Sequence, residues 1–152
     1  MFNIVLVEPE IPQNTGNIVR TCHATGSALH LVRPLGFAID DAKLKRAGLD
    51  YWHDVRIEYH DSFFDLVQPG RRFYLATTKA QKCYTDFRFD EGDYLVFGKE
   101  TAGLEQRIRD WSPSTQMRIP MLGDTRSLNL SNAVAIVLYE ALRQTGFAPG
   151  LR

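Results

Sequence analysis

Short apolar runs alternate with stretches of helical periodicity along the chain. Apolar runs bounded by turn residues are typical of buried strands, and we expect strands at residues 3–7, 29–32, 55–59, 73–77, 94–97 and 117–121. The intervening segments predict helices at residues 14–24, 40–48, 62–67, 104–109 and 128–145. Strands that alternate with helices form βαβ units. The sequence therefore predicts an α/β fold with a mainly parallel sheet and helices on both faces.

Polar residues and glycines mark the expected ends of two helices. Asn14 is in position to cap the first helix, because short polar side chains accept hydrogen bonds from the first helical N–H groups. Gly26 follows that helix, where a glycine can adopt the left-handed conformation that ends it. Asp40 precedes a short basic helix that we expect to end at Gly48.

The last predicted helix is apolar nearly all round, with one charge between Ala133 and Leu142. Such a helix has no face suited to water, and in so small a domain the sheet covers only one side of it. Either the helix is wedged inside the monomer or it contacts a second copy, since a two-fold interface presents the same patch twice. We favour a homodimer, and we expect a charge at Val137 or Tyr139 to dissociate or unfold the protein.

The length and composition indicate one ordinary globular domain, residues 1–152. No apolar run approaches the roughly 18 residues that a membrane span needs, and the first residues lack the basic leader of a secretory signal. Cys22 and Cys83 form no CxxC pair, which favours reduced thiols. We therefore expect a cytoplasmic protein that does not contact a membrane.

The net charge and the spacing of the histidines support neither a dedicated nucleic-acid binder nor a metal site. The 18 basic residues balance the 18 acidic ones, whereas a dedicated nucleic-acid binder usually carries a basic surplus. The four histidines show no metal-ligand spacing and no cluster along the sequence, so we predict no metal site and assign no histidine to chemistry: His23, His30, His53 and His60.

The common ligand-binding motifs of α/β proteins are missing. The sequence contains no GxGxxG fingerprint, no phosphate-binding GxxxxGK[ST] loop, no HExxH pair and no GxSxG elbow. A ligand would therefore be bound in another way, near the carboxyl ends of the strands, where open α/β sheets bind their ligands.

Three polar clusters each follow a predicted strand. The first spans residues 8–20 (EPEIPQNTGNIVR), the second spans residues 97–104 (FGKETAGL), and the third comprises residues 119–121 (IPM) and 126–133 (RSLNLSNA). In order and place they resemble the three motifs of the SPOUT RNA methyltransferases of the SpoU branch. The first cluster and GLDY at 48–51 are similar to the YibK/TrmL group, whose members methylate the wobble-nucleotide ribose of leucine tRNAs. The resemblance runs essentially from end to end.

The resemblance implies a deep C-terminal trefoil knot, S-adenosylmethionine as cofactor, tRNA as substrate and a homodimer. Composition and periodicity do not predict the knot, since knots are very rare in proteins. In the family the cofactor lies within the knot loops, which here are residues 76–78, 98–103 and 119–129. The cofactor-binding residues that this implies are Ala76, Thr77, Thr78, Gly98, Glu100, Gly103, Ile119, Met121, Ser127 and Leu128.

The same resemblance implies the catalytic and RNA-binding residues. The catalytic set is Arg20, Glu100, Ser127 and Asn129, and the RNA-binding set is Asn14, Asn17 and Arg20. Because a guanidinium stays protonated at neutral pH, we expect Arg20 to bind the adjacent phosphate and stabilise a developing alkoxide. The ribose proton would go to Glu100, to the phosphate or to water. Ser127 and Asn129 either position the cofactor and ribose or cap the last helix.

One departure from the family pattern concerns RNA. Where the pattern has GPETRG, this chain has Lys99 and Ala102, so the arginine that usually contacts RNA in this loop is missing. Two alternatives to a tRNA wobble methyltransferase remain at this point. One is a nucleotide- or RNA-binding module without catalysis, and the other is a SPOUT methyltransferase with a different RNA substrate.

Overall fold

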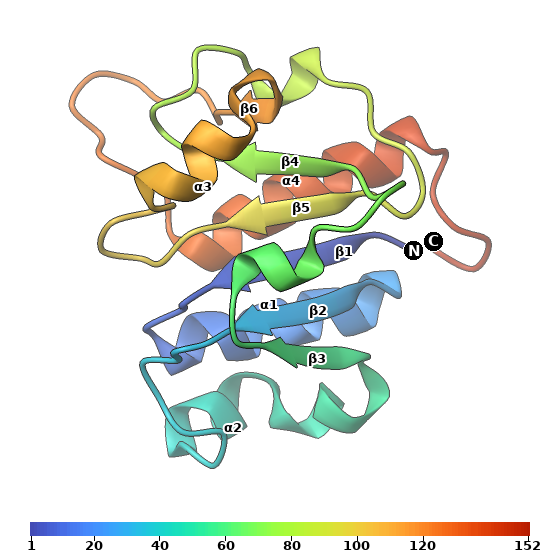
Figure 1. Ribbon diagram of the computed structural model, residues 1–152. Coiled ribbons are helices and arrows are strands. Elements are labelled where there is room, and N and C mark those ends of the chain that lie inside the picture. The colour runs from blue at the N-terminus through green and yellow to red at the C-terminus, as the bar shows by residue number, and fades with distance from the viewer.

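A six-stranded parallel sheet forms the centre of the computed structural model (Figure 1). The strands are ordered β3-β2-β1-β5-β4-β6, and every strand pair is parallel. They are β1 (Asn3–Val7), β2 (Ala28–Val32), β3 (Ile57–His60), β4 (Phe73–Ala76), β5 (Tyr94–Phe97) and β6 (Gln116–Met117). The structure describes residues 1–152, except for the side-chain surroundings of residues 48 and 49. The predicted α/β fold with a parallel sheet is confirmed.

Helices cover both faces of this sheet, but unequally. Two long helices, α1 (Pro12–Thr25) and α4 (Leu130–Gln144), lie along one face, as Figure 1 shows. The other face carries the short helix α3 (Gln106–Trp111) and the single 3-10 turn η2 (Phe63–Leu66). The remaining helical segments are α2 (Ala42–Gly48), η1 (Leu49–Asp54), η3 (Tyr84–Asp86) and η4 (Pro113–Thr115).

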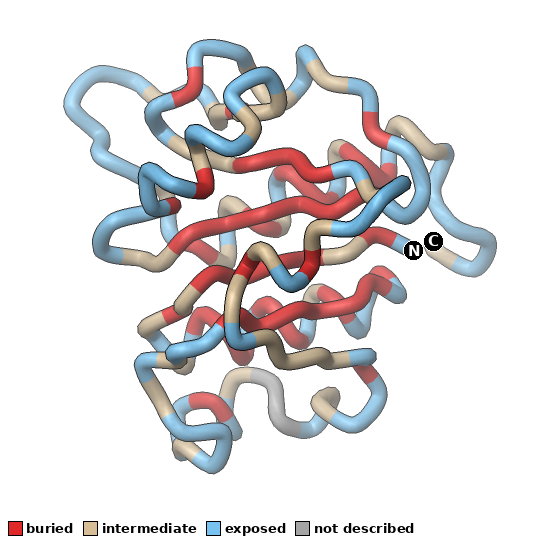
Figure 2. Tube along the Cα trace, viewed as in Figure 1, coloured by how far each residue is buried: buried red, intermediate tan, exposed pale blue. Residues whose placement is uncertain are grey.

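Two apolar cores follow from the alternation of side chains along each strand. In β1, Ile4 and Leu6 pack with α1 and α4, whereas Val5 and Val7 pack with η2 and α3. Successive side chains of a strand point to opposite faces, so a strand that is apolar throughout must be covered on both sides. Figure 2 shows the central strands buried along most of their length.

The ends of α1 are set by backbone conformation. Pro12 occupies the first turn, where its fixed φ suits the helix and its missing N–H costs nothing. Ile11 is the N-cap, so the prediction that Asn14 caps this helix is wrong: Asn14 lies inside the first turn. Gly26 ends the helix with φ 68°, as predicted. For α2 the prediction is off by one residue, because Asp41 and not Asp40 accepts the Lys43 N–H, at 2.8 Å.

The last helix, α4, begins two residues later than predicted, after its N-cap Asn129. Val137 is fully buried against the sheet inside the monomer, so of the two expected effects of a charge at this position the structure favours unfolding over dissociation. Ile136 and Tyr139 are 36% and 45% exposed. The helix is therefore wedged into the core along one side and carries apolar side chains at the surface along another.

Two short elements differ from their predictions. The helix predicted at residues 62–67 is a 3-10 turn, whose N-cap Ser62 and Asp65 form reciprocal capping bonds. The strand predicted at residues 117–121 has only two residues, and the chain after Met117 runs as a loop. The trefoil knot implied by the family resemblance stays a prediction.

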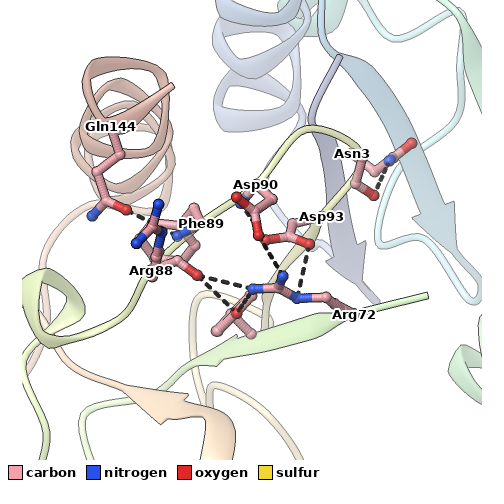
Figure 3. A network of polar contacts seen from close by, with 9 residues as sticks. Asn3, Arg72, Arg88, Phe89, Asp90, Asp93 and Gln144 are labelled. Atoms are coloured by element: carbon pink, nitrogen blue, oxygen red, sulfur yellow. Dashed lines mark hydrogen bonds and ion pairs between the residues drawn. The ribbon is translucent and has the colours of Figure 1, made fainter. Parts of the chain in front are cut away.

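A polar network closes the edge of the sheet where the strands begin, and we call it the amino-edge network (Figure 3). It consists of Arg72, Tyr74, Arg88, Asp90 and Asp93. The Arg72 guanidinium donates to the Asp90 carboxylate at 2.6 Å and to the Arg88 carbonyl at 2.9 Å, and its Nε lies 3.3 Å from the Asp93 carboxylate. Burial raises the pKa of the Asp93 carboxyl, although the Asp90 N–H and Arg72 oppose that rise.

Two amides extend this edge on either side of the network (Figure 3). Asn3 donates to the Gly92 carbonyl at 3.0 Å. Gln144, in the last turn of α4, accepts the Phe89 N–H at 2.9 Å and donates to the Phe87 carbonyl at 3.0 Å. These bonds fasten the end of α4 to the segment that leads into β5.

Candidate active site

A cavity of about 420 Å³ lies at the opposite edge, where β4, β5 and β6 end. Because the strands are parallel, the loops that follow them meet at one edge. All ten residues that the family resemblance implies for the cofactor line this cavity: Ala76, Thr77, Thr78, Gly98, Glu100, Gly103, Ile119, Met121, Ser127 and Leu128. They come from three loops far apart in the sequence, and the fold brings them together.

The loop after β5 crosses itself at Gly98. A Cβ added to Gly98 would overlap the backbone of Gly103 and Leu104, and the Gly103 N–H donates to the Lys99 carbonyl at 2.8 Å. Gly103 has φ +67°, a left-handed conformation that favours glycine. The two glycines thus allow the loop to fold back closely on itself, because the α-carbon of Gly98 faces the backbone of Gly103 and Leu104.

Two glutamates hold this loop to the first motif in a reciprocal way. The Glu100 carboxylate accepts the backbone N–H of Glu10 at 2.7 Å and that of Ile11 at 3.2 Å. The Glu10 carboxylate in turn accepts the Thr101 N–H at 3.0 Å and its hydroxyl at 2.7 Å. The two bonds from Thr101 lower the pKa of the Glu10 carboxyl. Glu100 lies at the N-terminal end of α1, where the helix dipole favours a negative charge.

An amide pair joins the starts of the two long helices. Asn129 donates to the Asn14 side-chain oxygen at 3.0 Å, and its own oxygen accepts the N–H groups of Ser131 and Asn132. The nearly buried Asn14 also directs its amide nitrogen at Glu100, 3.5 Å away. We call Glu10, Asn14, Glu100, Thr101 and Asn129 the carboxyl-edge network. Asn129 therefore does cap α4, whereas Ser127 lies before the cap in an exposed loop.

Two of the predicted residues lie away from the cavity. Arg20 and Asn17 are exposed on α1 and are not part of the cavity lining. The Arg20 guanidinium stands 5.7 Å from the centre of the Tyr51 ring, against which His23 also packs. In a single chain, therefore, Arg20 does not face the space that the three loops enclose.

Sequence reasoning missed several groups at this edge. The cavity lining also includes Lys79, Thr101 and Arg126, and Glu10 binds Thr101 from outside the lining. Glu8, which has a positive φ of 54°, lies 4.0 Å from Lys99. The sequence feature that could have pointed to Glu8 and Glu10 is the pair of acidic residues in EPE at 8–10, directly after β1.

The prediction that the histidines form no cluster is wrong. His30 and His60, 30 residues apart, lie on the neighbouring strands β2 and β3 with ring nitrogens 3.0 Å apart. Glu58 completes this group. Its three members are not part of the cavity lining.

Solved structures similar to this chain include RNA methyltransferases. A structure described as "Structural insights into the 2-OH methylation of C/U34 on tRNA" superposes with a TM-score of 0.90 and 46% identity, over 96% of this chain and 97% of that one. The SpoU methyltransferase AviRb from Streptomyces viridochromogenes, solved with its cofactor AdoMet, gives a TM-score of 0.83 and 25% identity, over 94% of this chain and 60% of that one.

Sequence comparison narrows the class of RNA methyltransferases to one family. The SpoU rRNA Methylase family matches residues 1–139, and this chain belongs to it. A tRNA (cytidine(34)-2'-O)-methyltransferase of Escherichia coli K12 is 52% identical, over 99% of this chain and 97% of the relative. The enzyme of the same name from Methylovorus glucosotrophus is 50% identical, over 97% and 98%. Among the described residues, no helix is long and apolar enough to cross a membrane.

Proposed function

We propose that this protein transfers the methyl group of S-adenosylmethionine to the ribose 2′-hydroxyl of the cytidine or uridine at position 34 of a tRNA. The observation that carries the proposal is the near-full-length identity of about 50% with tRNA (cytidine(34)-2'-O)-methyltransferases. Among tRNAs we favour leucine tRNAs as substrates, because the sequence resembles that of the YibK/TrmL group. Because its substrate would be a tRNA, we place the protein in the cytoplasm.

The cavity suits the proposed cofactor. Its volume of about 420 Å³ falls in the usual range of small-molecule sites. Apolar side chains such as Leu104, Ile119 and Leu128 offer walls for an adenine ring, and Thr77 and Thr78 offer hydroxyls. When bound, S-adenosylmethionine supplies a methyl group activated by its sulfonium.

Glu100 positions the site in this proposal and does not take the ribose proton. Both of its oxygens already accept backbone N–H groups at the start of α1. A carboxylate so engaged fixes the loop against the first motif, and with it the cavity wall. The proton then goes to the phosphate or to water. Asn14 and Asn129 act in the same way, because their amides bind each other.

Arg20 acts on the RNA and not on the cofactor. Its charge is held at the surface of α1, where a phosphate can reach it. A guanidinium binds phosphate through two parallel N–H donors, and it would stabilise the alkoxide that develops as the hydroxyl attacks. Because Arg20 lies outside the cavity of its own chain, it would have to serve the cavity of a second copy.

A homodimer therefore belongs to the proposal. Ile136 and Tyr139 lie three residues apart on α4 and are exposed, as is Ile11 near the start of α1. A two-fold interface over α1 and α4 would cover them and bring Arg20 to the partner's cavity. Tyr139→Glu should give a folded monomer that has lost methyl transfer, whereas Phe147→Glu, at an exposed aromatic outside α4, should remain dimeric. A wild-type monomer in sedimentation at micromolar concentration would exclude this arrangement.

The substrate is tested by mass spectrometry of nucleosides from tRNA. A strain without the gene should lack the 2′-O-methyl group at position 34, and the wild-type gene should restore it where Arg20→Ala does not. With purified protein, a leucine tRNA transcript should accept methyl groups, and one with a 2′-deoxyribose at position 34 should not. Unchanged methylation in the deletion strain would contradict the proposed substrate. Transfer to the deoxy transcript would contradict the proposed acceptor atom.

A further inference from the structure

On the sheet face that carries η2 and α3, three side chains converge at the edge formed by β2 and β3. The Nδ1 atom of His30 lies 3.0 Å from Nε2 of His60 and 3.6 Å from a carboxylate oxygen of Glu58. That oxygen lies 3.9 Å from the same His60 nitrogen. The register pairs His30 with Glu58 and Val32 with His60, so all three side chains stand on one face.

We propose that His30, Glu58 and His60 bind a divalent transition-metal ion of the zinc type. Two imidazoles and one carboxylate are a ligand set that zinc uses, with a fourth position left for water. In a tetrahedral zinc site with bonds of about 2.0 Å, ligand atoms stand about 3.3 Å apart. The separations here, from 3.0 to 3.9 Å, bracket that value.

The groups behind these ligands already orient them. Asn3 donates to the Gly92 carbonyl and so turns its side-chain oxygen to Nε2 of His30, 3.1 Å away. This places the His30 proton on Nε2 and leaves the Nδ1 lone pair directed at the other two ligands. Arg56 holds the second oxygen of Glu58 at 2.7 Å. Metal-binding histidines and carboxylates are commonly fixed by outer hydrogen bonds of these two kinds.

The two histidine rings share one proton, which a metal must displace. Because Nδ1 of His30 is unprotonated, Nε2 of His60 donates its proton to it in the present arrangement. On binding, that proton leaves to solvent and another is taken up at Nδ1 of His60, with no net release.

The surrounding charges are mixed. Asp65 attracts a cation, whereas Arg33, Arg56 and Arg71 repel it. Each arginine is engaged with another group: Arg33 with Asp61, Arg56 with Glu58, and Arg71 with the Leu66 carbonyl. They weaken the affinity but leave the three ligand atoms free to bind. Because the group is outside the cavity lining, the ion would join the edge strand to its neighbour and take no part in methyl transfer.

Calorimetric titration with Zn²⁺ tests the site, using tag-free protein stripped with EDTA. We expect one ion per chain, and a Kd at least tenfold weaker in His60→Gln and in Glu58→Gln. The exposed His53 provides the matched control His53→Gln, whose Kd should not change. Asn3→Ala removes no ligand, yet it should also weaken binding about tenfold by freeing the His30 ring.

Two further measurements separate this site from unspecific binding. Co²⁺ should give the visible bands of a tetrahedral site without a thiolate charge-transfer band, which excludes the partly exposed Cys83 as a ligand. Zinc at a hundredfold excess over Kd should raise Tm by roughly 5 °C or more, and EDTA should leave methyl transfer unchanged. No Zn²⁺ uptake at millimolar concentration, or uptake that survives both His60→Gln and Glu58→Gln in folded protein, overturns the proposal.

Discussion

Both edges of the sheet carry polar networks, but only the network at the carboxyl edge borders a cavity. At the amino edge, Arg72 draws two carboxylates and a carbonyl together around the strand starts. At the carboxyl edge, Glu10 and Glu100 exchange hydrogen bonds between two loops that border a cavity. Both networks are well paired, so pairing alone does not mark a site. What distinguishes the carboxyl edge is that its network joins loops that border a cavity, whereas the amino-edge network closes the sheet.

The largest expected effect is the loss of methyl transfer in Arg20 variants. These variants test whether the site at the carboxyl edge needs a side chain that lies outside the cavity of its own chain. Arg20→Ala should lower methyl transfer by about 100- to 1000-fold, the usual cost of removing one donor to a developing oxyanion. Calorimetry should show S-adenosylmethionine bound as in the wild type, and Tm should hold because the side chain is exposed. Arg20→Lys should recover part of the loss. Loss of cofactor affinity together with activity would place Arg20 on the cofactor side.

The next largest effect is the pH dependence of stability that His30 causes. This histidine is buried in the sheet and does not line the cavity. Burial lowers its pKa from 6.5 to about 4 in the folded chain, so between these values the unfolded chain binds more protons. Stability should therefore be fully present above about pH 6.5 and fall as the pH drops towards 4, by on the order of 3 kcal/mol. Urea unfolding of metal-free protein across this range measures the slope. A slope just as steep in His30→Gln would assign it to other groups.

A smaller effect is expected for Glu100, and it separates positioning from proton transfer. Glu100→Gln keeps an oxygen that can accept one N–H but loses the charge that both backbone donors meet. Stability should fall by about 1–3 kcal/mol, and cofactor affinity should fall with it. The pH dependence of methyl transfer should keep its shape. A profile that loses a titration step in this variant would identify Glu100 as the proton acceptor.

The smallest effect lies at the amino edge. Arg72→Met should cost about 1–2 kcal/mol of unfolding free energy, because Arg72 is partly exposed but its loss leaves the buried Asp93 carboxylate with the Asp90 N–H alone. Methyl transfer per folded molecule should not change. Arg107→Met, at a more exposed arginine on α3, provides the control and should be neutral. Equal activity losses in the Arg72 and Glu100 variants would remove the difference between the two edges.

The sequence predicted best what depends on local pattern. Five of the six strands and both long helices lie close to their predicted positions, since alternation and periodicity are properties of neighbouring residues. The cavity residues were found through the family resemblance, which identified loops such as Gly98–Gly103 that patterns alone left unassigned. The mismatch at Asn14 arose because Pro12 begins the helix earlier than a polar cap would.

What the sequence did not predict depends on contacts between distant segments. The backbone of Glu10 and the carboxylate of Glu100 meet across 90 positions, and His30 and His60 meet across 30. Neither spacing corresponds to a helix turn or a strand repeat, so no periodicity could reveal these pairs. Val137 is a further example. The apolar sequence around it is compatible with a dimer interface or with the core, and only the packing of α4 against the sheet shows that it is core.

The order of the strands in the sheet also determines when each strand can find its partners during translation. β1 is made first and lies in the middle of the sheet, with β2 on one side and β5 on the other. The second edge of β1 stays open until Tyr94–Phe97 has been translated, which at about 5–20 residues per second takes roughly 5 to 18 s after β1 is complete. An open apolar strand edge is a template for wrong pairing. The nascent chain should therefore depend on ribosome-bound chaperones during this interval, and slow codons between residues 32 and 94 should increase aggregation without altering the finished protein.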